Sequence, residues 1–290
     1  MQKMEIGKID LHMHSIVSDG TDTPSELLKH VRDAGITLFS LTDHDAVNGC
    51  AMIREILSEN DPKLLNGTEF SCRDEHGKYH ILGYNYDPDS KSIKDMVEAG
   101  HRYRMKKVRT RLDYIRDEYG FTFSEQDTQD LLAMSSPGKP HIANLMVRYG
   151  YAPSKETAIC DYLNKAPVHS EYVRPEDAIQ SILAGNGIPV LAHPAYGSGD
   201  ELIVGSEMDQ RLRRLIEYGL QGVEAFYSTF PPKLRKETLS FAEKYDLYVT
   251  AGSDYHGKNK FIPLGKTNLD KAAEIPGGMK RFLEAVDNQQ

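Results

Sequence analysis

Short apolar runs separated by amphipathic stretches occupy both ends of this chain. Apolar and β-branched residues predict strands over 8–14, 36–41, 64–72 and 79–84. Helical periodicity predicts helices over 24–34 and 46–59, the first opened by Pro24 and followed by Gly35 as a stop signal. Strands and helices in this order predict βαβ units and a parallel sheet.

The same alternation returns in the last third of the chain. We expect helices over 175–184, 208–218, 231–244 and from 276, and strands over 189–192, 222–226 and 247–251. The stretch between the two parts has helical patterns only, at 91–119, 125–133, 141–149 and 155–163. We therefore predict an α/β fold in which 1–91 and 173–290 form one barrel and 92–172 form a small all-helical insertion domain.

Composition narrows the class of protein. The 290 residues include 35 Lys+Arg and 43 Asp+Glu, a formal charge of −8, which argues against a surface coated for long nucleic acids. No apolar run approaches the ~20 residues of a membrane span, and the N-terminus lacks a signal-peptide core, so we expect a cytoplasmic protein. Cys50, Cys72 and Cys160 form no CxxC pair, which disfavours disulfide frameworks and thiolate zinc sites.

Histidines and carboxylates recur at the ends of the predicted strands. The C-terminal ends of parallel strands meet at one edge of an α/β fold, so these side chains are expected to share one site. His12 and His14, two apart on a predicted strand, would face the same side. The candidate ligands are His12, His14, Asp19, His44, Glu69, His80, His193, Asp254 and His256.

Nitrogen and carboxylate donors without sulfur suit Mn²⁺, Fe²⁺ or Zn²⁺, and this set is too large for one ion. We expect two to three divalent ions with bridging carboxylates. Such a centre attracts phosphate and holds both the attacking and leaving oxygens, so phosphoester hydrolysis is the natural chemistry.

Five segments resemble the motifs of a known family: IDLHMHSIVSDG, LTDHDAVNG, GTEFS, VLAHPA and AGSDYHG. They are similar, in this order, to those of the PHP (polymerase and histidinol phosphatase) family. SDG after HxH and the helical insertion look most like its trinuclear branch, which includes nucleoside 3′,5′-bisphosphate phosphatases and a 5′-to-3′ exoribonuclease. The resemblance implies a distorted (β/α)7 barrel, three metals held by the nine candidate ligands, and in-line attack by a metal-activated hydroxide.

The insertion carries GKPHIANLMV, where relatives usually read GRPHIAR with an arginine on the substrate phosphate. Lys139 and Asn144 replace both arginines, and Lys139 lacks their bidentate fork. By resemblance we expect Lys139 and His141 to bind substrate and His141 to act in catalysis. Tyr227 and Phe230 stand near positions where relatives often have histidine, which leaves the leaving-group preference open.

Two further features allow more than one interpretation. Asp10 and Asp43 precede candidate ligands, and we expect Asp43 to orient a histidine and so to serve catalysis. The segment 101–116 holds seven Lys/Arg and one Asp. It is either a solvated helix face or a guide for phosphates, with Tyr103 available for stacking.

We therefore expect a phosphoesterase that removes the 3′-phosphate of nucleoside 3′,5′-bisphosphates. The alternative is a 5′-to-3′ exonuclease on short RNA or DNA; histidinol-phosphate phosphatase and a non-catalytic metal-binding module rank lower. Neither a GxxxxGK phosphate loop nor a GxSxG nucleophile motif is present. No membrane or obligate protein partner is expected.

Overall fold

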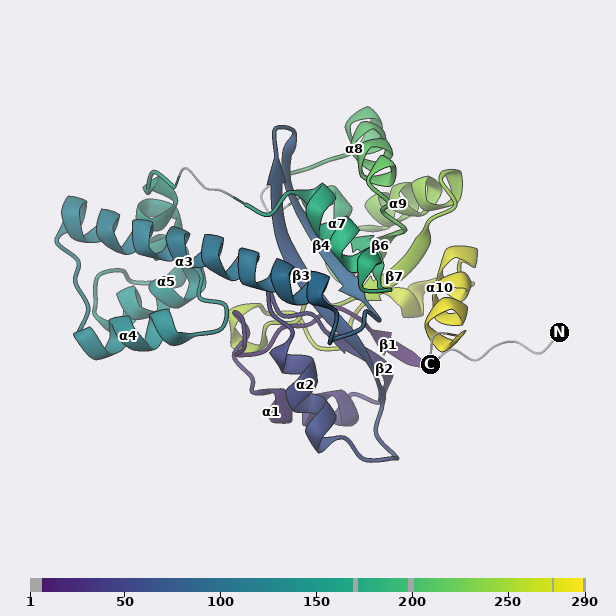
Figure 1. Cartoon of the computed structure of the whole chain (residues 1–290), viewed down its shortest axis with the longest axis horizontal. Helices are drawn as coiled ribbons and strands as arrows, with labels where there is room; N and C mark the ends of the chain where they lie inside the picture. Colours follow the sequence, from purple (N-terminus) through teal and green to yellow (C-terminus); the bar gives the residue numbers. More distant parts are fainter. Residues whose placement is uncertain (1–6, 169–171, 198–200, 273, 289–290) are drawn as a thin grey trace.

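The computed structural model describes residues 7–168, 172–197, 201–272 and 274–288 and contains one seven-stranded sheet (Figure 1). Its strands follow one another in the order of the sequence. They are β1 (Lys8–Asp10), β2 (Ile36–Leu41), β3 (Lys63–Asp74), β4 (Gly77–Tyr84), β5 (Ile188–Leu191), β6 (Gly222–Tyr227) and β7 (Tyr248–Gly252).

The sheet closes into a distorted barrel. The Leu11 amide donates to the Ala251 carbonyl at 2.9 Å, and Met13 bridges Tyr255, which joins the first strand to the last. The expected parallel sheet is interrupted at β4, which runs antiparallel to both β3 and β5. Only two residues connect β3 to β4, too few for the crossover that a parallel pair requires.

The predicted strand over 8–14 is shorter in the structure, where β1 ends at Asp10. The Asp10 carboxylate accepts hydrogen bonds from the amides of Ser253 and Gly265, so it ties the chain to the loops beyond β7. His12 and His14 therefore lie on the loop that leaves the sheet rather than on the strand itself.

Six helices surround the barrel as expected from the periodicity, and the helix predicted over 175–184 begins and ends as predicted. The Thr23 side chain and Glu26 form a capping box at the start of α1. These helices are α1 (Pro24–Asp33), α2 (Asn48–Ile56), α7 (Pro175–Ala184), α8 (Gly205–Glu217), α9 (Pro232–Lys244) and α10 (Gly277–Asn288).

The helical segment projects to one side of the barrel (Figure 1). It comprises α3 (Lys91–Tyr119), α4 (Glu125–Ala133), α5 (Lys139–Arg148) and α6 (Lys155–Thr157), and the last continues into a π-helical turn at Ala158–Tyr162 and a 3₁₀ turn at Leu163–Lys165. Its buried apolar residues form a separate cluster that includes Val108, Ile115 and Met146.

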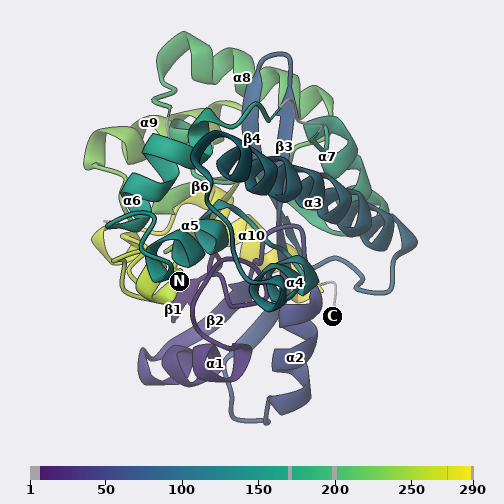
Figure 2. The same ribbon diagram turned by 90° about the vertical axis from the view of Figure 1, so that its left-hand side faces the viewer.

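Helix α3 belongs to both parts of the molecule. Its first turn buries Ile93 in the cluster between α7 and the sheet, whereas its later turns contribute to the core of the helical segment. A view from the helical side shows α5 and α6 in front of the barrel (Figure 2). No helix in the described ranges has both the length and the apolar character needed to cross a bilayer.

Candidate active site

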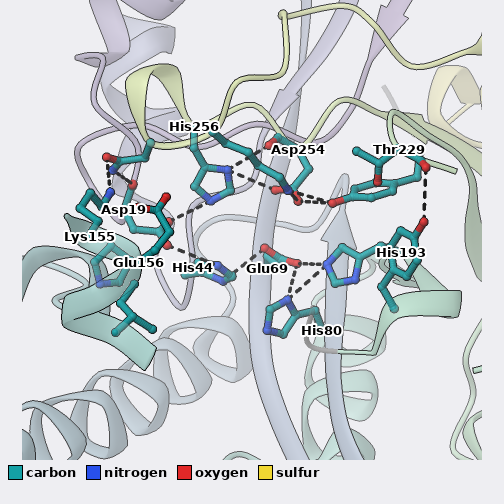
Figure 3. A pocket seen from close by; sticks show the side chains of 16 residues that line it. Asp19, His44, Glu69, His80, Lys155, Glu156, His193, Thr229, Asp254 and His256 are labelled. Carbon is teal, nitrogen blue, oxygen red and sulfur yellow. Dashed lines mark hydrogen bonds and ion pairs between the residues drawn. The ribbon is translucent and has the colours of Figure 1, made fainter. Parts of the chain in front are cut away.

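All nine side chains predicted as ligands converge at the mouth of the barrel, where the strands end. Figure 3 shows seven of them, all except His12 and His14. His12, His14 and Asp19 follow β1, and His44 follows β2. Glu69 and His80 lie on the hairpin of β3 and β4, while His193 follows β5 and the pair Asp254 and His256 follows β7.

Glu69 lies at the centre of one half of this cluster. Its Oε2 atom is 3.3 Å from His12 Nε2 and 3.2 Å from both His14 Nε2 and His44 Nδ1. Its Oε1 atom is 2.9 Å from His80 Nδ1 and 3.2 Å from His193 Nε2. One carboxylate thus reaches five imidazoles, three with one oxygen and two with the other.

Asp254 and Asp19 organise the other half. Asp254 Oδ1 lies 3.4 Å from His14 Nε2 and 3.3 Å from His256 Nδ1. Asp19 Oδ1 lies 3.3 Å from His256 Nε2, on the side of the cluster nearest the helical segment. His193 and Asp254 have positive φ, +27° and +55°. Such backbone strain is typical of functional sites, and it aims both side chains into the mouth.

The donor set fits divalent cations. The nine residues divide into four overlapping groups whose ligand atoms lie within 4.8 Å of one another. Within the described part of the chain, Asp19 Oδ1 and His44 Nδ1 are buried without a hydrogen bond. Imidazole nitrogens and carboxylate oxygens converging in this way, without sulfur, match Zn²⁺, Mn²⁺ or Fe²⁺.

Electrostatics keep the acidic ligands ionised. Burial alone would raise the pKa of Glu69, but the surrounding histidines, led by His44 and His12, hold it well below its ordinary value. The pKa of Asp254 is also lowered, against the effect of burial, by Lys260 and the neighbouring histidines. Burial lowers the pKa of His44 to about 3, so this imidazole is neutral and able to coordinate.

Glu224 is a residue of the site that the sequence reasoning missed. It lies fully buried on β6, where Oε1 is 3.0 Å from His12 Nδ1 and Oε2 accepts the His193 amide at 2.9 Å. A Cβ at Gly252 would lie 2.2 Å from His12 Cβ and 2.3 Å from Glu224 Oε1, so only glycine fits beside this pair. A glutamate inside the apolar strand GVEAFY was the available signal.

Asp43 is buried and contacts the ligands indirectly. It accepts hydrogen bonds from the Ser15 amide at 2.8 Å and from the Ser18 hydroxyl at 2.6 Å, and that hydroxyl lies 3.4 Å from His14 Nδ1. Asp43 therefore braces the loop that carries His14 and Asp19.

Tyr227 lines the mouth where relatives were expected to have histidine. Its hydroxyl donates to Asp254 Oδ2 at 2.7 Å, and Lys260 contacts the same oxygen. Phe230 packs edge-on against the Tyr227 ring. Asp254 thus directs one oxygen to the histidines and the other to Tyr227 and Lys260.

The helical segment covers one side of the mouth. Pro140, Lys155, Glu156 and Ile159 line a cavity of about 530 Å³ together with seven of the candidate ligands and with Tyr196, Tyr227, Thr229, Asn259 and Lys260. Lys155 contacts Asn259 of the loop after β7. The sequence motif KPHIA lies beside this cavity, with Pro140 at its wall.

The two residues of KPHIA expected to bind substrate, Lys139 and His141, do not line the ligand cavity. Lys139 Nζ donates to Asn164 Oδ1 at 3.0 Å and lines a second cavity. His141 Nδ1 accepts the Gly138 amide at 3.0 Å, and the ring is mostly buried near Asp19 and the Ser18 backbone, with burial lowering its pKa. His141 therefore lies where the helical segment meets the barrel.

Comparisons with known proteins agree with this geometry. The family model described as PHP domain matches residues 10–174, more than half of the chain. A 5′-3′ exoribonuclease of Haemophilus influenzae is 28% identical, covering 95% of this chain and 99% of its own. A phosphoribosyl 1,2-cyclic phosphate 1,2-diphosphodiesterase of Eggerthella lenta is also 28% identical, over 88% and 96%. A 3′,5′-nucleoside bisphosphate phosphatase of Chromobacterium violaceum is 26% identical, over 87% and 88%.

The fold is also shared with a solved structure. A crystal structure from Bifidobacterium adolescentis, provisionally named a metal-dependent phosphoesterase, superposes with a TM-score of 0.82 at 27% identity and covers 96% of each chain. Together with the family match, this similarity confirms the expected barrel and the expected class of enzyme. The chain belongs to the PHP domain family and is a metal-dependent phosphoester hydrolase.

Proposed function

We propose that this enzyme hydrolyses the 3′-phosphate of nucleoside 3′,5′-bisphosphates. The observation that carries the proposal is the convergence of nine imidazole and carboxylate ligands at a barrel mouth partly covered by the helical segment. A cavity of about 530 Å³ is of the size that encloses a small nucleotide. A relative of similar length is named as a phosphatase of this substrate class.

We assign the nine converging residues as ligands of two to three ions. Bound ions would polarise the phosphoryl oxygens and supply a water-derived nucleophile at neutral pH. Glu224 holds His12 in the orientation that presents Nε2 to the cluster, and Asp43 does the same for His14 through Ser18. The ligands are His12, His14, Asp19, His44, Glu69, His80, His193, Asp254 and His256.

Residues 92–172 form, in this proposal, a cap that selects substrates, while 1–91 and 173–290 form the catalytic barrel. Lys155 is the cation of the cap that lines the ligand cavity, and its side chain is well placed to meet a substrate phosphate. His141 is assigned to the joint between cap and barrel, where it accepts the Gly138 amide at the start of α5.

A second candidate is 5′-to-3′ exonucleolytic cleavage of short RNA. The observation that favours it is the full-length similarity to the Haemophilus exoribonuclease, together with a second cavity that extends away from the ligands. This reaction uses the same ligands but needs room for a chain of nucleotides.

The deciding experiment compares adenosine 3′,5′-bisphosphate, a short 5′-phosphorylated RNA, a cyclic phosphate ester and histidinol phosphate as substrates, with Mn²⁺ supplied. We expect the bisphosphate to give the highest kcat/KM. Asp254→Ala should abolish turnover, whereas Asp246→Ala, on the exposed surface, should not. Faster mononucleotide release from RNA would favour the exonuclease, and no turnover of any ester by metal-replete protein would leave a non-catalytic module.

A further inference from the structure

A second cavity, of about 480 Å³, opens directly beside the ligand cavity. The two share Asp19, His44 and His80 as walls, so one molecule can extend from one into the other. Six cationic side chains line the second cavity: Arg73, Lys78, Arg104, Lys107, Arg111 and Lys139. They come from β3, β4, α3 and α5, and only the folded chain brings them together.

These cations are partly withdrawn from water. Lys107 Nζ lies 3.9 Å from the centre of the Tyr172 ring, and burial together with Arg104 lowers the pKa of Lys107 to about 7. Arg111 is mostly buried, and its Nε atom has no hydrogen-bond partner among the described residues. A buried guanidinium nitrogen without a partner is costly unless a ligand satisfies it.

Few carboxylates balance this charge. Asp45 binds Arg104, which also donates to the Ser71 hydroxyl at 3.0 Å. Among described residues, no carboxylate lies within ion-pair distance of Arg73, Lys78, Lys107 or Arg111. Among the described residues that line this cavity, positive charge therefore exceeds negative charge although the whole chain has a formal charge of −8, an arrangement that an anion would stabilise.

We infer that this cavity is a subsite for a second phosphate of the substrate, remote from the phosphate that is hydrolysed. The identity of the substrate in this inference rests on the proposed function. The negative charge of the group that occupies the cavity follows from the cationic side chains that line it. The cavity wall formed by His44 and His80 is also the wall of the ligand cluster, so the second phosphate lies one cavity away from the reacting one. Lys107 and Arg111 are its central cations.

The test uses the metal-replete enzyme and the double variant K107M/R111Q. The control is K106M/R109Q, which removes the same two charges from exposed positions of the same helix. We measure kcat/KM for adenosine 3′,5′-bisphosphate relative to adenosine 3′-monophosphate. Charged hydrogen bonds to a phosphate predict that this ratio falls about 10- to 100-fold in K107M/R111Q and stays within about twofold of wild type in the control.

A trinucleotide with a 5′-hydroxyl, whose phosphates are all internal phosphodiesters, forms a second arm that identifies the source of the phosphate. A selective loss with the bisphosphate assigns a terminal phosphomonoester to the cavity, and a selective loss with the trinucleotide assigns an internal phosphodiester. Unchanged ratios for both substrates would overturn the inference, as would equal losses in K106M/R109Q.

A binding measurement separates this inference from the proposed function. We expect sulfate to raise the Tm of wild type and K106M/R109Q above that in chloride of equal ionic strength, and K107M/R111Q to lose at least half of this rise. If no phosphoester is hydrolysed but this difference persists, the proposed function fails and the anion site stands. Equal sulfate effects in all three proteins would overturn the anion site.

Discussion

The two cavities at the barrel mouth share Asp19, His44, His80 and Pro140 but differ in chemistry. The first gathers histidines and carboxylates, donors that suit cations, and the second gathers arginines and lysines, which suit anions. The strand ends supply the first set, whereas α3 crossing the β3–β4 hairpin supplies most of the second. A cation site beside an anion site would let the protein hold one phosphate of a substrate while it activates another. Because different residues line the two cavities, substitutions can impair one cavity and leave the other intact.

The largest expected effect comes from removing a ligand of the first cavity. Asp254→Ala deletes the carboxylate that contacts His12, His14 and His256. We expect loss of activity to the background of the assay and loss of bound metal, measured by elemental analysis of the purified protein. Full metal content with full activity would contradict the assignment of the cluster.

Breaking the ion pair between Arg104 and Asp45 should cause the largest loss of stability. Arg104 and Asp45 are nearly buried and join α3 to the loop after β2. Arg104→Leu leaves the Asp45 carboxylate uncompensated, so the free energy of unfolding should fall by about 3–5 kcal/mol.

Urea denaturation measures this loss, and the double variant R104L/D45N is the matched control. Removing both charges should restore part of the stability. A double variant as unstable as R104L alone would mean that packing of the Arg104 stem, rather than its charge, dominates.

Altering the orientation of a ligand should weaken the first cavity without abolishing it. Glu224→Gln keeps the shape of the side chain but removes the charge that faces His12 Nδ1. We expect metal affinity or activity to fall about 10- to 100-fold. Titration of the metal-depleted protein with Mn²⁺ measures the metal affinity. Glu224→Ala should lower this affinity further, because it also removes the acceptor for the His193 amide.

Separating α3 from the barrel tests how the second cavity is assembled. Gly100 is buried in α3, and a Cβ there would lie 2.9 Å from the Cβ of Asp45. Gly100→Ala should stabilise the helix by about 1 kcal/mol through its higher helix propensity. The steric clash with Asp45 should destabilise the protein by about 1–3 kcal/mol. We expect a net loss of stability in urea denaturation, and a gain would show that α3 can move away without cost.

The smallest effect is a pH dependence that belongs to the second cavity. Lys107 has a folded pKa of about 7 and an unfolded value near its ordinary ~10.4, because it is buried and faces other cations. Between these values the unfolded chain binds the proton and the folded chain does not, so stability rises with pH. The charged groups facing Lys107 are Arg104, Arg111 and Asp45, and the Cys72 thiol and the Tyr172 ring also lie against it.

Lys107→Met removes this titration. Its Tm should exceed that of wild type at pH 6, where the penalty for the buried charge is complete, and the difference should shrink as pH approaches 10. The exposed Lys106→Met is the control and should show no such trend. A constant difference across this range would mean that Lys107 stays charged in the folded protein.

Local patterns predicted most of the fold. The helices expected over 91–119, 125–133 and 175–184 begin and end as predicted, because periodicity, caps and stops act within a few residues. The antiparallel direction of β4 departs from the expected parallel sheet, because the two-residue turn between β3 and β4 allows only an antiparallel pair. The last helix of the insertion was expected to be regular and instead changes to a π turn at Ala158, at the edge of the ligand cavity.

The chain by itself determined which residues carry ligand chemistry, because histidine and aspartate at strand ends can be read from adjacent positions, as in His12 and His14. Tertiary structure alone decided that Glu224 faces His12 and that Lys139 lines the second cavity rather than the ligand cavity. It also decided that Lys107 and Arg111 turn inward while Lys106 and Arg109 remain exposed. The physical reason is that the sequence gives the chemical type of each side chain directly. The burial of that side chain and its distance from other charges depend instead on how segments far apart in the sequence pack together.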